Sequence, residues 1–281
     1  MPAEGPSSLT ERVLRRDRWV VAGGLALLTL LAWAYILAGA GMGMPAWHMI
    51  SVSLFPHRLA EMPMGGMATM GNGMWSAAHW LLVMAMWWVM MIAMMTPSAA
   101  PVILLYGRAT RHAQAGGGWK HGMVPTAAFA AGYLVTWLAF SIAATLLMWA
   151  LEVVGVVSPV SMGSRAAWLS ASVLIAAGLY QFSPLKHACL RACRGPAEFL
   201  TRHWRPGSFG ALRMGLEHGV FCVGCCWVLM LLLFVGGIMN PLWIAILSLL
   251  VVVEKIVPFG PQLAYLVGAI LIVWGVATLL V

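Results

Sequence analysis

Long apolar runs recur along the whole chain, and they limit its fold more than any other feature of the sequence. Of the 281 residues, 62% are hydrophobic and only 9% are charged, whereas a soluble domain carries about 25% charged residues. A run of about 20 apolar residues is long enough to span a bilayer as a helix. Lipid tolerates only helices and closed barrels, and the alternating ten-residue pattern of barrel strands is missing. The sequence therefore predicts an all-α, polytopic transmembrane helix bundle.

The ends of the apolar runs predict seven transmembrane helices. These are expected over residues 19–38, 77–105, 125–151, 166–182, 217–238, 241–257 and 261–281. Residues 1–18 then form a cytoplasmic tail, and residues 19–281 form a single integral-membrane domain. That domain has a methionine-rich outer loop at 39–76 and a basic, cysteine-containing inner loop at 183–216. The first run also resembles a signal peptide, but its apolar core exceeds the usual length of about 7–15 residues, which favours a retained helix.

The basic residues predict how the helices are oriented. If the N-terminus is cytoplasmic, fourteen of the 16 Lys and Arg residues lie in inner segments, and only Arg58 and Arg165 lie outside. Cytoplasmic loops of membrane proteins carry such an excess of Lys and Arg, so the C-terminus is expected on the outer face. This topology accounts for the net charge of +8. The lipid bilayer is therefore the expected partner, and nucleic acid is not.

The stretch HGVFCVGCC places one histidine and three cysteines on one face of the fifth predicted helix. Each residue of a helix advances the side chain by about 100°, which brings the four into one arc of about 100°. They are His218, Cys222, Cys225 and Cys226. Thiolate and imidazole groups suit Cu(I), Zn(II) or Fe–S centres. A single cysteine in an apolar helix is usually a small packing residue, but three with a histidine favour a metal site.

A second cysteine pair lies in PLKHACLRACRGP, where Cys189 and Cys193 are four residues apart. Basic neighbours make such thiols more reactive. All five cysteines are predicted on the cytoplasmic side, where thiols are kept reduced, and an odd number excludes complete pairing. No structural disulfide is expected.

Methionine is unusually abundant, with 21 residues. Thioethers are soft ligands that suit Cu(I), and the outer loop holds several in the short stretch MPMGGMATM. These candidate ligands are Met62, Met64, Met67 and Met70. Met94 and Met95 of the second helix are predicted at the depth of the cysteines in the fifth helix. If the two helices are neighbours, soft ligands form a ladder across the membrane, although packing also explains methionines inside a helix.

Glu254 and Lys255 are adjacent charges at the end of the sixth predicted helix. Ionisable groups within a membrane are costly and tend to be functional. Alternatively, long side chains near a helix end reach out to the membrane surface.

Several of these motifs, AMMTPSAAP, YQFSPLKHACLRACRGP and HGVFCVGCCWVLM followed by EK, resemble the bacterial family of predicted metal-binding integral membrane proteins of unknown function. The resemblance covers most of the chain from the second helix onward, and the two cysteine motifs are its specific part. It implies a multi-span helical protein with a metal site, located in the bacterial inner (cytoplasmic) membrane. The positions that it carries over are Met94, Met95, Pro97, Tyr180, Gln181, Pro184, Cys189, Cys193, His218, Cys222, Cys225, Cys226, Glu254 and Lys255.

The leading functional hypothesis is copper handling, in which outer thioethers collect Cu(I) and the inner thiol–imidazole face binds it for transport or insertion. Zn(II) or another soft metal also fits these ligands. A metal chaperone or a membrane complex is the expected protein partner. Two alternatives stay open: a membrane thiol–disulfide oxidoreductase that uses the inner cysteines, and a non-catalytic assembly subunit. No catalytic residue is assigned, because no nucleotide-binding loop, nucleophile elbow or HExxH motif occurs.

Overall fold

The structure is a computed structural model that describes residues 9–41, 50, 75–115, 124–158 and 162–280. These residues form ten α-helices and no β-strand, so the predicted all-α class is confirmed. The helices are α1 (Leu9–Leu37), α2 (Ala77–Ala115), α3 (Val124–Val153), α4 (Ala167–Gln181), α5 (Pro184–Arg194), α6 (Pro196–His203), α7 (Gly207–Leu231), α8 (Leu233–Gly236), α9 (Pro241–Ile256) and α10 (Gly260–Leu280).

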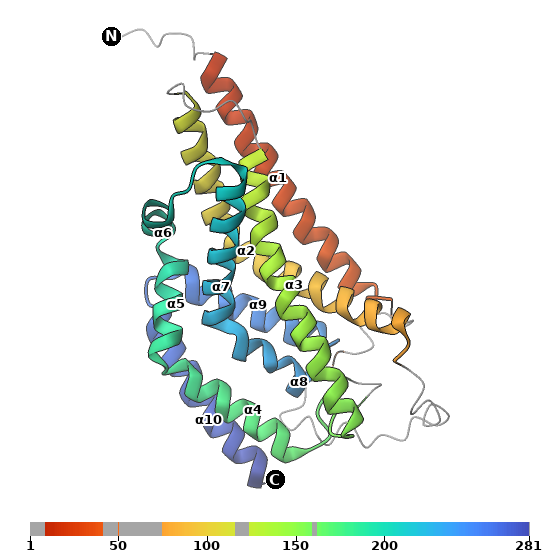
Figure 1. The fold of residues 1–281 in the computed structure, drawn as a ribbon. Helices are drawn as coiled ribbons and strands as arrows, with labels where there is room; N and C mark the ends of the chain where they lie inside the picture. Colours follow the sequence, from red (N-terminus) through yellow and green to blue (C-terminus); the bar gives the residue numbers. More distant parts are fainter. Residues whose placement is uncertain (1–8, 42–49, 51–74, 116–123, 159–161, 281) are drawn as a thin grey trace.

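The helices pack as a bundle in which α1 begins at one end and α10 finishes at the other (Figure 1). The helix α3 packs along α7, α4 packs along α10, and α1 packs on α2. The short helix α5 lies against α7, while α9 contacts α2, α5 and α10. The centre of the bundle is therefore shared by α2, α5, α7 and α9.

Five helical segments in the described residues are long and apolar enough to cross a membrane. They are Arg18–Leu37, Ala77–Arg111, Val124–Val153, Gly207–Gly236 and Gly260–Leu280. The helices α4 and α5 make a sixth if this pair, bent by 64°, counts as one span. The helix α9 has only 16 residues, which is shorter than the roughly 20 residues of a typical span. The predicted count of seven and the predicted orientation thus stay predictions.

The segment 183–216, predicted to be a loop, is largely helical. The side chain of Ser183 accepts a hydrogen bond from the Leu185 amide and Pro184 follows, so a capped helix begins at once. The helix α7 begins at Gly207, ten residues before the predicted start, and an i,i+4 ion pair between Arg213 and Glu217 supports its first turns. The three cysteines of α7 thus lie beyond the midpoint of the helix and not near its start, as the predicted helix boundary implies.

Glycines allow α3 and α7 to pack with their backbones almost in contact. A Cβ atom at Gly132 would collide with the Leu212 carbonyl group, and one at Gly215 would collide with the Phe129 carbonyl group. Small residues bring membrane helices together in this way. This packing fixes the position of α7, the helix that carries His218 and three of the five cysteines.

Large apolar side chains remain exposed on the outer faces of α1 and α10. They include Leu27, Leu30, Leu31, Leu266, Ile270 and Val273. Soluble monomers rarely expose large continuous apolar patches. The surface is therefore compatible with a membrane protein.

Candidate metal centre

The contact between α5 and α7 brings together all five cysteines of the chain, each with a free thiol. The Cys193 side chain from α5 makes hydrogen-bonding contacts with Cys222 and Cys225 of α7. Cys222 also contacts Cys226 on its own helix. Two cysteine motifs separated by about thirty residues in sequence thus form one sulfur cluster, which consists of Cys189, Cys193, Cys222, Cys225 and Cys226.

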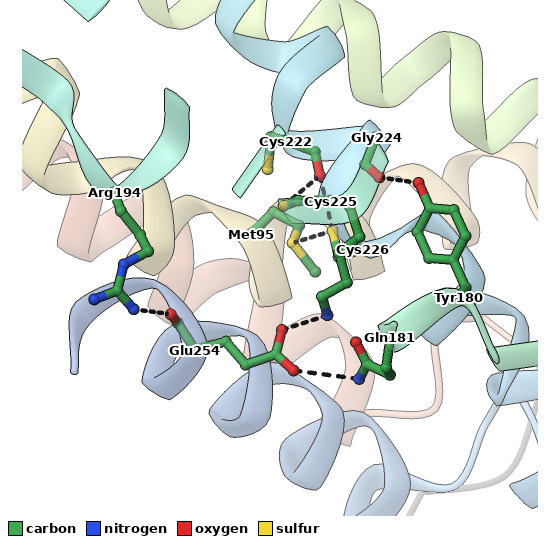
Figure 2. Close-up of polar contacts among 10 residues, drawn as sticks. Met95, Tyr180, Gln181, Arg194, Cys222, Gly224, Cys225, Cys226 and Glu254 are labelled. Carbon is green, nitrogen blue, oxygen red and sulfur yellow. Dashed lines mark hydrogen bonds and ion pairs between the residues drawn. The ribbon is translucent and has the colours of Figure 1, made fainter. Parts of the chain in front are cut away.

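The helix α5 can lie this close to α7 because α7 has a glycine at the crossing. A Cβ atom at Gly224 would stand 2.7 Å from the Cys189 sulfur. The hydroxyl group of Tyr180 donates a hydrogen bond to the Gly224 carbonyl oxygen, which ties α4 to the same turn (Figure 2). On α5 itself, Lys186, Cys189 and Cys193 are spaced for one helix face.

Cys222 is the most highly connected thiol of the cluster. The Lys255 ammonium group from α9 donates a hydrogen bond to its sulfur at 3.0 Å, and the Tyr133 hydroxyl from α3 lies 3.1 Å from it. Lys255 also donates to the Ser98 hydroxyl of α2 at 3.0 Å. A positive charge is therefore held in contact with the Cys222 sulfur, where it can balance a thiolate.

Cys225 and Cys226 both direct their thiols at the Cys222 carbonyl oxygen, at 3.1 and 3.0 Å (Figure 2). The Cys226 sulfur also lies 4.0 Å from the Met95 sulfur of α2. No three His, Cys, Asp or Glu side chains in the described part of the chain are arranged to hold a metal ion. Binding would therefore require these thiols to leave the carbonyl oxygen, but as donors they are of the soft type that Cu(I) prefers.

A buried ion pair lies beside the sulfur cluster. The Lys186 ammonium group is 2.7 Å from the Glu254 carboxylate, with side-chain exposures of 0% and 2%. Gln181 donates to the same carboxylate at 3.2 Å, and Arg194 donates to the Glu254 carbonyl oxygen at 2.8 Å (Figure 2). Glu254 is buried against Lys186, and Lys255 is buried against Cys222 and Ser98. The alternative that Glu254 and Lys255 reach the membrane surface is therefore wrong.

His218 is buried but has an aromatic environment. Its ring centroid is 5.0 Å from that of Phe199, 6.0 Å from that of Tyr133 and 6.2 Å from that of Phe129. Its Nδ1 atom is buried and has no hydrogen-bond partner in the described residues. The prediction that His218 shares the buried face of its helix with the three cysteines is consistent with their burial.

Of the six methionines predicted as ligands, the structure describes two, Met94 and Met95. Met95 contacts Cys226, whereas Met94 is fully buried and its carbonyl oxygen accepts a hydrogen bond from Ser248. The candidates of the outer loop, Met62, Met64, Met67 and Met70, lie outside the described residues.

Sequence reasoning missed three polar neighbours of the cluster: Lys186, Tyr133 and Ser98. Each is buried, and each carries a hydrogen-bonding group into an otherwise apolar region. Lys186 lies in the segment 183–216, which is predicted to be a loop, and a lysine in a loop needs no buried partner. No sequence signal therefore pointed to its pairing with Glu254.

Comparison with known proteins places the site within a family. The model of the PpoB2 family, described as a copper chaperone, matches residues 84–278. These residues include the whole sulfur cluster, Met95, His218 and Lys255. No curated protein and no solved structure is significantly similar to the chain. Because the family match covers well over half of the 281 residues, the chain belongs to the PpoB2 copper chaperone family.

Proposed function

We propose that this protein is a membrane-embedded chaperone that holds Cu(I) at the sulfur cluster and passes it to a partner protein. The observation that carries the proposal is the meeting of all five thiols with the Met95 thioether in the buried centre of the bundle. Membership of a copper chaperone family supports copper as the cargo. The exposed apolar faces of α1 and α10 support the membrane location.

Cys222, Cys226 and Met95 are the ligands that we assign to Cu(I). Two sulfur atoms that bind one ion at about 2.3 Å in a trigonal site stand about 4 Å apart, which agrees with the 4.0 Å between the Cys226 and Met95 sulfurs. Cys222 is in contact with Cys226. A set of two thiolates and one thioether is soft enough to select Cu(I) over Zn(II), for which four-coordinate N/S sites are usual.

Electric charge supports the same ligand set. Two thiolates and one Cu(I) carry a net charge of −1, and the thioether adds none. The buried Lys255 ammonium group touches Cys222 and brings the total to zero. A neutral total avoids most of the desolvation cost of burying a charge.

The remaining thiols give the ion a way to leave. Cys193 and Cys225 contact each other, and both contact Cys222. A soft ion can therefore move by exchanging one sulfur ligand for the next. This arrangement suits a carrier, which must both bind and release its cargo.

The proposal is tested by loading the purified full-length protein in lipid nanodiscs with Cu(I) under anaerobic conditions. We expect about one tightly bound copper per chain in the unsubstituted protein, and none at this site in Cys222→Ser or Cys226→Ser. Met95→Leu should weaken the affinity by about tenfold or more, whereas Met94→Leu, its buried neighbour, should not. Equal copper in the unsubstituted protein and in the Cys222→Ser/Cys226→Ser variant would contradict the proposal.

A further inference from the structure

The ring of Phe199 on α6 lies between two imidazole rings. His203 stacks on it with a centroid distance of 4.7 Å and an interplanar angle of 20°. His218 of α7 meets it edge to face, at 5.0 Å and 62°. Phe199 and His218 are only 3% and 2% exposed, whereas His203 is half-buried. The three rings thus lead from the surface of the protein to its interior.

The inner end of this row adjoins the sulfur cluster. His218 precedes Cys222 by four residues on α7, so the two side chains are neighbours on one helix face. The ring of Tyr133 connects them, because it contacts the imidazole ring and its hydroxyl group lies 3.1 Å from the Cys222 sulfur.

The Nδ1 atom of His218 is buried without a hydrogen-bond partner among the described residues. Leaving a polar atom in this state is costly, and it is rare in folded proteins. This cost is explained if the nitrogen atom is kept free for an ion that binds it only transiently. A neutral imidazole is a suitable ligand for a copper ion.

We propose that His203, Phe199 and His218 form the access route by which Cu(I) reaches Cys222 and Cys226. This inference rests on the proposed function and adds a direction to it. The ion binds first to His203, passes the Phe199 ring, and binds His218 for a short time before the thiols take it. Copper stays Cu(I) throughout, and each step replaces one ligand atom by another.

The order of the ligands favours inward movement. Cu(I) is a soft ion that prefers thiolate to imidazole, so the ion is more stable at the cysteines than at either histidine. Phe199 acts as the gate, because its buried ring lies between the two imidazoles. The helix α6 that carries it has only eight residues, and its Glu198 and Arg202 side chains are exposed.

The test separates the rate of loading from the affinity. The full-length protein in nanodiscs is mixed with Cu(I) bicinchoninate, and the loss of the coloured complex is followed by stopped flow and then to equilibrium. We expect His218→Phe and His218→Gln to load about tenfold more slowly, with unchanged stoichiometry and affinity. His203→Gln should also be slower. Phe199→Ala should load faster, which is the opposite of what misfolding would cause.

His79 provides the matched control, since it lies at the start of α2 and packs on Trp75, away from α6. His79→Gln should load at the rate of the unsubstituted protein. The inference is overturned if the unsubstituted protein takes up copper and all His218 and His203 variants load equally fast. It is also overturned if His218→Phe loses copper at equilibrium, because His218 would then be a permanent ligand. If the unsubstituted protein itself takes up no copper, the proposed function fails with it.

Discussion

At the scale of single residues, Glu254 links three helices at the centre of the bundle through buried polar and charged contacts. Its carboxylate binds Lys186 and Gln181, and its carbonyl oxygen binds Arg194, so one residue joins α9 to both α4 and α5. Such a pair contributes little net stability compared with apolar residues, but removal of one partner leaves a buried charge alone. Its main consequence is that α5, which carries Cys189 and Cys193, is held against α9.

Substitution of one partner of this pair should therefore be more harmful than substitution of both. We expect Lys186→Met to lower the free energy of unfolding by about 3 kcal/mol, since it leaves the Glu254 carboxylate unpaired. The double variant Lys186→Met/Glu254→Gln should recover most of this loss. Unfolding in mixed detergent and SDS micelles, followed by circular dichroism, measures both values. A double variant that is less stable than Lys186→Met alone would show that the pair does not act in this way.

At the scale of helices, the glycines of α3 and α7 decide how closely the cysteine-bearing helix can pack. Gly215 is the clearest case, because its Cα atom faces the Phe129 backbone and leaves no space for a methyl group. The same type of contact occurs between Gly178 and Gly268, where α4 crosses α10. Positions of this kind set the distance between two helices.

Gly215→Ala should force α3 and α7 apart and lower the free energy of unfolding by about 1–3 kcal/mol. Gly24→Ala on α1 is the matched control, because nothing lies within 4 Å of a Cβ atom at Gly24. That substitution should be neutral or stabilising by up to about 1 kcal/mol, since alanine favours a helix more than glycine does. The same micelle unfolding experiment compares the two, and equal stabilities would contradict the role given to Gly215.

Part of this helix arrangement can be predicted from the sequence, and part cannot. Apolar length and periodicity are local properties, so they predicted the all-α class and the shared face of Cys222, Cys225 and Cys226. The boundaries of α5, α6 and α7 were missed because polar residues there form helices that pack on one another. The pairing of Lys186 with Glu254, and of Lys255 with Cys222, depends on the 64° bend between α4 and α5 and on the packing of α9. No local pattern contains that information.

At the scale of the whole molecule, the distribution of basic residues predicts which segments lie on each side of the membrane. Arg165 lies in the connection before α4, which is predicted outside, while Arg202 lies on α6, which is predicted inside. Both side chains are exposed. The native cysteines are mostly buried, so labelling of the unsubstituted chain measures the background reaction of a thiol reagent.

We expect a membrane-impermeant maleimide to label Arg165→Cys in intact spheroplasts, because this position faces outward if the N-terminus is cytoplasmic. Arg202→Cys should react only after the membrane is opened. Mass spectrometry of the purified chains reads out both results. The reverse labelling pattern would invert the topology, and the proposed copper route from α6 would then begin on the outer side.

The central claim, that this molecule carries Cu(I) on sulfur, is tested most directly by X-ray absorption at the copper edge of the loaded full-length protein. The account predicts a Cu(I) edge and a first coordination shell made of sulfur alone. Cys222→Ser/Cys226→Ser should lose this signal. A first shell of nitrogen or oxygen, or a sulfur shell that persists unchanged in the double variant, would contradict it.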